Sequence, residues 1–143
     1  MEVQVSLGAA EGVSEDLLRS AVDLVLRDAG VTDGEISLAL LDDQAIRELN
    51  RTYLGRDRPT DVMAFALHEE GESLLGDIYV GHEQALRQAG EMAVPLIEEL
   101  VRLTIHGTLH VLGHGHPETD ARFESEMFQL QERLLQELLD EAS

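Results

Sequence analysis

The sequence predicts an α+β domain in which a small mixed sheet of about four strands is covered by helices. Strand-like runs fall early in the chain, amphipathic helical stripes dominate its second half, and no regular strand–helix–strand alternation runs throughout. A chain of 143 residues can bury a substantial core of its own, so we expect residues 1–143 to form a single domain.

The chain begins with a strand followed by a capped helix. Apolar side chains alternate over residues 1–7, which predicts a strand with one apolar face. Ser14 is a suitable N-cap, because its hydroxyl can accept a hydrogen bond from an amide of the first helical turn. The following helix carries an apolar stripe on one face, and Gly30 is expected to end it.

The middle of the chain is predicted to hold a strand, a short helix and a hairpin. An apolar run predicts a strand over residues 36–41, and one of the two aspartates at 42–43 is expected to cap the helix after it. Residues 54–60 contain a glycine and a proline and are predicted to form a loop. Two strands over residues 61–67 and 74–80 are joined by a short polar stretch, which indicates an antiparallel hairpin.

The second half of the chain is predicted to be helical. A short helix is expected over residues 82–89, and Pro95 is suited to open the next one, because its missing amide proton costs nothing at a first turn. From residue 119 to the end, apolar residues at helical spacing predict a long amphipathic helix. Its acidic residues fall opposite this stripe, which favours core packing on one face and solvent on the other.

Composition excludes several classes of site. The chain has no cysteine, so disulfides and thiolate metal sites are excluded, and a zinc ion here would need histidine or carboxylate ligands. Neither a signal peptide nor a membrane span is recognisable, and we expect a soluble, cytoplasmic protein with no membrane partner. The formal charge of −19 argues against generic nucleic-acid binding. Four of the ten arginines nevertheless fall within residues 47–58 and can form a local positive patch.

The run from His106 to His116 is the most informative feature of the sequence. His106 and His110 are four residues apart, so on a helix their side chains lie on the same face. Gly113 can adopt positive φ, end the helix and turn the chain so that His116 reaches the same point. Three imidazoles with an open fourth position are the ligand set of a catalytic zinc. We therefore predict one zinc ion per chain, although nickel, copper and iron also accept imidazole.

Such a metal predicts hydrolytic chemistry. Zinc held by three neutral imidazoles keeps its full charge, so it can lower the pKa of a bound water and supply a nucleophile. His114 lies on the predicted turn, either as a proton shuttle or as an exposed turn residue. Asp61 follows Thr60 at a loop-to-strand junction, where it has a role in the site or forms a turn and cap. Asp77 lies within an apolar strand, where it orients a ligand histidine or faces solvent on an edge strand.

The histidine spacing by itself is compatible with two further kinds of protein. The same histidine spacing occurs in zinc proteases of the metzincin type, which place a glutamate directly after the first histidine as the general base. This chain has Gly107 at that position, so a protease would need its base from elsewhere. The other alternative is a non-catalytic domain in which zinc only supports the fold. It would be favoured by a fourth protein ligand such as His114.

Three segments together resemble the YbeY family of bacterial zinc-dependent endoribonucleases. They are His106–His116, the stretch from Leu49 to Phe65 that contains Pro-Thr-Asp-Val, and Leu75–Ile78. The resemblance covers nearly the whole chain. It implies zinc ligation by His106, His110 and His116, a cleft for single-stranded RNA, and a role in maturation of the 3′ end of 16S ribosomal RNA. It also implies the ribosome or ribosome-assembly proteins as partners.

The chain departs from the family pattern at three positions. Leu54 stands where the family usually has an arginine that handles phosphate, and Arg56 or Arg58 of the same loop is a candidate substitute. Both arginines either contact phosphate or neutralise nearby acids. Ala64 replaces a usual serine, and Gly115 replaces an aspartate that commonly precedes the last histidine.

Overall fold

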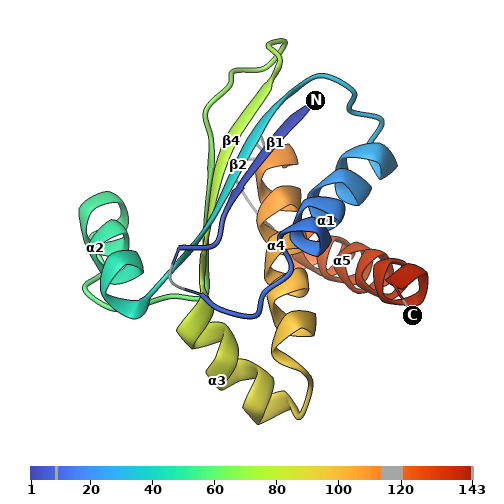
Figure 1. The fold of residues 1–143 in the computed structure, drawn as a ribbon. Helices are drawn as coiled ribbons and strands as arrows, with labels where there is room; N and C mark the ends of the chain where they lie inside the picture. The colour runs from blue at the N-terminus through green and yellow to red at the C-terminus, as the bar shows by residue number, and fades with distance from the viewer. Residues whose placement is uncertain (9, 114–120, 143) are drawn as a thin grey trace.

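The computed structural model describes residues 1–8, 10–113 and 121–142. Four strands and five helices are present in these residues (Figure 1). In chain order they are β1 (Glu2–Ser6), α1 (Glu15–Asp28), β2 (Gly34–Leu41), α2 (Asp43–Leu54), β3 (Val62–Ala66), β4 (Leu74–Gly81), α3 (His82–Met92), α4 (Leu96–Leu112) and α5 (Ala121–Ala142). None of the helices in this part of the chain combines the length and the apolar character that crossing a membrane requires.

The sheet is mixed, as the sequence predicts. Its strand order is β1-β2-β4-β3, in which β1, β2 and β4 run parallel and β3 pairs antiparallel to β4. The predicted hairpin is therefore confirmed, with Ala64 opposite Ile78 in its register. The parallel pairs need crossover connections, which α1 and the α2–β3 segment supply. The α+β fold class is confirmed.

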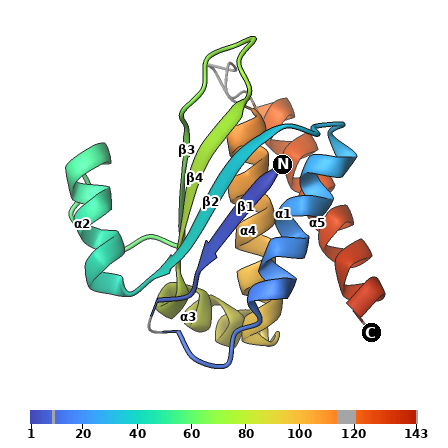
Figure 2. The ribbon, with the colours of Figure 1, turned by 45° about the horizontal axis from the view of Figure 1, so that its top comes forward.

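The helices pack mainly on one face of the sheet. Side chains alternate along β2 and β4, so that Ile36, Leu38, Ile78 and Val80 are buried on that face. Helices α1, α4 and α5 lie on this side, whereas α2 stands on the other side, near one end of the sheet (Figure 2). Helix α4 packs against β3, β4, α1, α3 and α5, so it occupies the centre of the domain.

Glycines allow α4 to approach the sheet closely. A Cβ atom added to Gly107 would lie 2.6 Å from Cγ2 of Ile78, and one added to Gly76 would lie 2.6 Å from Cγ1 of Val111. Both distances are shorter than any ordinary carbon contact. The helix backbone therefore rests directly on β4, and the side chains on either side of Gly107 are held at a fixed height above the sheet.

Most helix ends follow the sequence signals. The hydroxyl of Ser14 accepts from the amide of Leu17, and the carboxylate of Asp42 accepts from the amide of Ala45. The prediction for Gly113 is wrong in one respect. This residue ends α4, but its φ is −80°, and its amide bonds to the carbonyl of Leu109 at 2.8 Å. The last turn of α4 thus closes with right-handed backbone geometry, which any residue can adopt.

Candidate metal centre

Two predicted metal ligands meet on the C-terminal half of α4. The Nε2 atoms of His106 and His110 lie 3.0 Å apart, and their rings are inclined by 66°. Zn–N bonds of about 2.0–2.1 Å at tetrahedral angles place two ligand nitrogens about 3.3 Å apart. The pair therefore converges nearly as two imidazole ligands of one ion do, because the helix sets one side chain a turn above the other.

The remaining histidines of the motif, His114 and His116, lie outside the described residues. In the described ranges, no three histidine or acidic side chains come close enough together to hold a metal ion. The donor chemistry of the pair still fits zinc, since both histidines present Nε2 toward a common point and imidazole is a preferred zinc ligand. The three-ligand set stays a prediction.

Gln131 is a contact of His106 that the sequence analysis did not anticipate. Its Oε1 lies 2.6 Å from Nδ1 of His106, the nitrogen that points away from His110. Gln131 belongs to α5 and is only 5% exposed. One signal for it was present: Gln131 lies four residues after Met127 and three before Leu134, on the apolar side of an amphipathic helix. A polar residue at such a position requires a buried partner.

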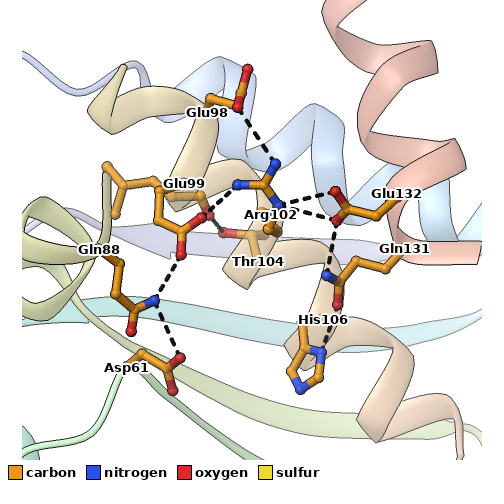
Figure 3. A network of polar contacts seen from close by, with 10 residues as sticks. Asp61, Gln88, Glu98, Glu99, Arg102, Thr104, His106, Gln131 and Glu132 are labelled. Carbon is orange, nitrogen blue, oxygen red and sulfur yellow. Dashed lines mark hydrogen bonds and ion pairs between the residues drawn. The ribbon is translucent and has the colours of Figure 1, made fainter. Parts of the chain in front are cut away.

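A continuous polar network begins at His106 and extends over α4 and α5 (Figure 3). Nε2 of Gln131 donates to Glu132 at 3.1 Å, and Glu132 accepts from Nε of Arg102. Arg102 also pairs with Glu99 at 2.7 Å. The network continues from Glu99 through Gln88 to Asp61, with Nε2 of Gln88 as the donor at 2.7 Å and 3.5 Å respectively.

Arg102 carries the charge at the centre of this network. Burial lowers the pKa of Arg102, but hydrogen bonds to Glu99 and Glu132 outweigh this effect and raise the pKa above its usual value. The guanidinium is therefore a fixed positive charge. Its side chain is only 14% exposed and also pairs with Glu98. Arg102 is thus fully committed to three carboxylates.

Two cavities flank the histidine pair, and both histidines line each of them. The larger, about 480 Å³, is bordered on the α4–α5 side by Asp61, Arg102 and Phe128. The smaller, about 260 Å³, is bordered on the side of α2 and β3 by Arg56, Asn50 and Phe65. The histidines therefore stand between two hollows of the surface, where one extended ligand can contact both.

The structure separates the other predicted site residues. Asp61 lines the larger cavity with the histidines, and its carboxylate accepts long hydrogen bonds from Gln88 and Thr60 at 3.5 Å each. Arg56 lines the smaller cavity. The side chain of Arg58 lines neither cavity, and its carbonyl accepts from Nδ2 of Asn50.

Neighbouring acids do not neutralise Arg56. The carboxylate of Asp57 pairs instead with Arg47 at 2.8 Å, and this hydrogen bond lowers the pKa of Asp57. Within the described ranges no hydrogen bond or ion pair engages the guanidinium of Arg56. Among the residues that the structure describes, no acidic side chain lines the smaller cavity. The positive charge of Arg56 is therefore available to an anion, despite the acidic composition of the whole chain.

Asp77 does not line either of the cavities beside His106 and His110. Its residue pairs with Phe65 and Ser37 in the register of the sheet, on the face opposite the buried Ile78. The hydroxyl of Tyr79 donates to it at 3.4 Å. Strand β4 lies inside the sheet and not at its edge, so the interpretation of Asp77 as an edge-strand residue is wrong. A role in orienting His106 or His110 is not supported, because α4 packs on the other face of β4.

Comparison with known proteins connects this arrangement to a family. Residues 4–139 match a family model described as Endoribonuclease YbeY. A Moorella thermoacetica protein of that name is 47% identical over 120 residues, which cover 73% of this chain and 76% of that protein. A Mycolicibacterium gilvum protein, also named Endoribonuclease YbeY, is 39% identical over 153 residues and covers 99% of this chain and 85% of its own length. A solution structure from Thermotoga maritima shares 31% identity, with a TM-score of 0.70 over 97% of this chain and 90% of that one.

Proposed function

This chain belongs to the YbeY endoribonuclease family, and from this premise we propose that it is a zinc-dependent endoribonuclease. The proposed substrate is single-stranded RNA, cleaved during maturation of ribosomal RNA in association with the ribosome or its assembly proteins. The observation that carries the proposal is the convergence of two imidazole Nε2 atoms, 3.0 Å apart, between two cavities. One of those cavities is lined by Arg56, whose guanidinium pairs with no side chain in the described ranges.

His106, His110 and His116 are the residues that would hold the zinc. When bound, zinc supplies a Lewis acid that polarises a phosphoryl oxygen and makes a water molecule more acidic. The protein contributes the placement of the ligands, since α4 keeps two of the three rings in register above the sheet. Rigid ligands are an advantage because a site that needs no rearrangement loses no binding free energy to reorganisation.

Arg56 is the residue proposed to bind phosphate. Arg56 lines the smaller cavity together with both histidines, and none of the described residues that border this cavity is acidic. A guanidinium binds phosphate oxygens through paired, charge-assisted hydrogen bonds. Phe65 in the same cavity packs edge-to-face on Tyr53, which is 64% exposed, so this side also offers aromatic surface on which an unpaired base can stack.

Asp61 is proposed to accept the proton of the attacking water. In the described part of the chain, the acidic residues that line the larger cavity with the histidines are Asp61 and Glu99. Glu99 is 2% exposed and occupied by Arg102 at 2.7 Å, whereas Asp61 accepts only two long hydrogen bonds. A base must have a free lone pair within reach of the reacting proton, which favours Asp61.

A protease mechanism lacks its base for a structural reason. The position that carries the glutamate in metzincin proteases is Gly107, where even a Cβ atom would overlap Ile78. A glutamate there would point into the sheet and could not act on a substrate. The absence of this base supports the choice of RNA as the substrate over peptides.

The test combines metal content with RNA cleavage. The purified protein is expected to contain one zinc per chain and to cleave a single-stranded ribosomal RNA fragment, but not the same sequence in a duplex. Cleavage should stop when a chelator is added and return with zinc. The His110→Ala protein should lose it, whereas His82→Ala, which alters a histidine outside the motif, should not. Full activity in His110→Ala would overturn the assignment of the site.

A further inference from the structure

We infer that Gln131 is a positioning residue that fixes the proton of His106 on Nδ1, and so keeps the lone pair of Nε2 directed toward His110. The inference deepens the proposed function, because it rests on His106 being a zinc ligand. A neutral imidazole carries one proton, and only the unprotonated nitrogen can bind a metal. The tautomer of His106 therefore decides whether the ring can serve as a ligand without first rearranging.

The contact itself is short and half-buried, at the wall of the larger cavity. Oε1 of Gln131 lies 2.6 Å from Nδ1 of His106, and Gln131 is 5% exposed. The partners come from different helices, α5 and α4, and are 25 residues apart in the chain. Buried side-chain amides are normally hydrogen-bonded, and His106 and Glu132 are the partners that this amide has.

Glu132 determines which end of the Gln131 amide faces the histidine. A side-chain amide can be turned over, which exchanges its acceptor oxygen for its donor nitrogen. Here the nitrogen lies 3.1 Å from Oε2 of Glu132, and a carboxylate can only accept. The reversed amide would set two oxygens against each other at this distance. Oε1 therefore faces His106, and Nδ1 of His106 must be the donor.

Arg102 holds Glu132 in turn. Its Nε donates to Oε2 of Glu132 at 3.1 Å, and its other nitrogens are anchored by Glu98 and Glu99 on α4 (Figure 3). The orientation of Gln131 is therefore set by an arginine fixed on the same helix as the histidines. The contacts from Arg102 through Glu132 to Gln131 thus fix the direction of the amide that faces His106. Packing alone would not select this direction.

The contact between the two histidines agrees with this tautomer. At 3.0 Å, the two Nε2 atoms need one donor and one acceptor. When Nδ1 of His106 carries the proton, its Nε2 is the acceptor, and Nε2–H of His110 donates to it. In this state the lone pair of His106 already lies on the side where a metal ion would sit.

The experiment measures the tautomer directly and needs no enzymatic activity. Long-range proton–nitrogen NMR spectra of the metal-free protein, at a pH where both rings are neutral, report which nitrogen of His106 carries the proton. The wild type should show the proton on Nδ1 alone. Gln131→Leu, which keeps the volume but removes the acceptor, should show a mixture of both tautomers. Gln129→Leu, on an exposed position of the same helix, is the matched control and should resemble the wild type.

A second variant and a second readout test the order of contacts. Glu132→Gln removes the constraint on the amide while leaving Gln131 in place, so it should also shift His106 toward a mixture, less than Gln131→Leu does. Zinc affinity, measured by competition with a chelating indicator, should fall about 10- to 100-fold in Gln131→Leu, as other losses of a ligand's orienting partner do. The Gln129→Leu protein should bind zinc as the wild type does.

Each outcome decides the inference. A wild-type His106 protonated on Nε2, or a tautomer unchanged in Gln131→Leu, overturns it. If the wild type binds no zinc or cleaves no RNA, the proposed function fails, but the tautomer measurement still decides the role of Gln131. If Gln131→Leu does not fold, as judged by circular dichroism, Glu132→Gln carries the test.

Discussion

The two sides of the histidine pair use arginine in opposite ways. On the α4–α5 side, Arg102 is 14% exposed and bound to three carboxylates. On the α2–β3 side, Arg56 is exposed and, in the part of the chain that the structure describes, bound to none. The first arrangement orders a network that ends on His106, and the second leaves a positive charge for a ligand. An arginine near a site can therefore bind a ligand anion only if carboxylates of the protein do not already pair with it.

The largest effect is expected on the α4–α5 side, where replacing Arg102 should lower the stability of the fold. Arg102→Leu leaves Glu99, which is 2% exposed, without its ion-pair partner. Removing one partner of a buried ion pair costs about 3 kcal/mol or more, because an uncompensated charge stays buried. The free energy of unfolding, measured with urea, should fall by about this amount. Arg133→Leu, at an exposed ion pair with Asp28, should cost less than about 1 kcal/mol; equal losses in the two variants would refute the contrast.

The next largest effect on stability is expected at the contact of α4 with β4, which lies between the two sides. Gly107→Ala forces a Cβ atom to within 2.6 Å of Ile78 and should destabilise the fold by about 1–3 kcal/mol, the range for overpacking a core. Gly90→Ala is the matched control, because it lies in α3 with no atom within 4 Å of the new methyl group. It should raise the free energy of unfolding by about 0.5–1 kcal/mol, since alanine favours helix. Stabilisation by both changes would show that α4 does not rest on β4 as described.

Replacing Arg56 should weaken RNA binding and leave the stability of the fold unchanged. Arg56→Ala is expected to weaken binding of single-stranded RNA by about 1.5 kcal/mol, roughly tenfold, through the loss of one charge-assisted contact. The slope of log Kd against log salt should fall by about 0.7, the value for one phosphate on a single strand. Arg58→Ala, which lies outside both cavities, should change the salt slope less. Identical slopes for both variants and the wild type would exclude Arg56 as a phosphate ligand.

The smallest effect on stability is expected for the exposed ion pair between Arg47 and Asp57. The hydrogen bond from Arg47 lowers the pKa of Asp57, so any stabilisation is present above the ordinary aspartate pKa and is lost as the pH falls through the lower folded value. Because both side chains are more than half exposed, solvent screens the pair. Asp57→Asn should leave the urea midpoint at pH 7 unchanged within error. A clear loss at pH 7 that disappears in acid would show that this exposed pair is stabilising after all.

Local signals in the sequence determined much of the fold. The caps at Ser14 and Asp42 and the hairpin were predictable, because each depends on residues close together in the sequence. The same holds for the meeting of His106 and His110, since a helix brings side chains four residues apart onto one face.

Only the tertiary structure decided which other side chains join the histidines. Gln131 reaches His106 across 25 residues, Asp61 joins them from the start of β3, and Arg56 lies at the cavity while Arg58 does not. Gly113 ends α4 without the positive φ that its residue type permits. The physical reason is that periodicity and capping act within one element. Contacts between elements depend on how closely helices and strands pack. Here α4 packs closely on β4 because Gly107 has no side chain at the contact.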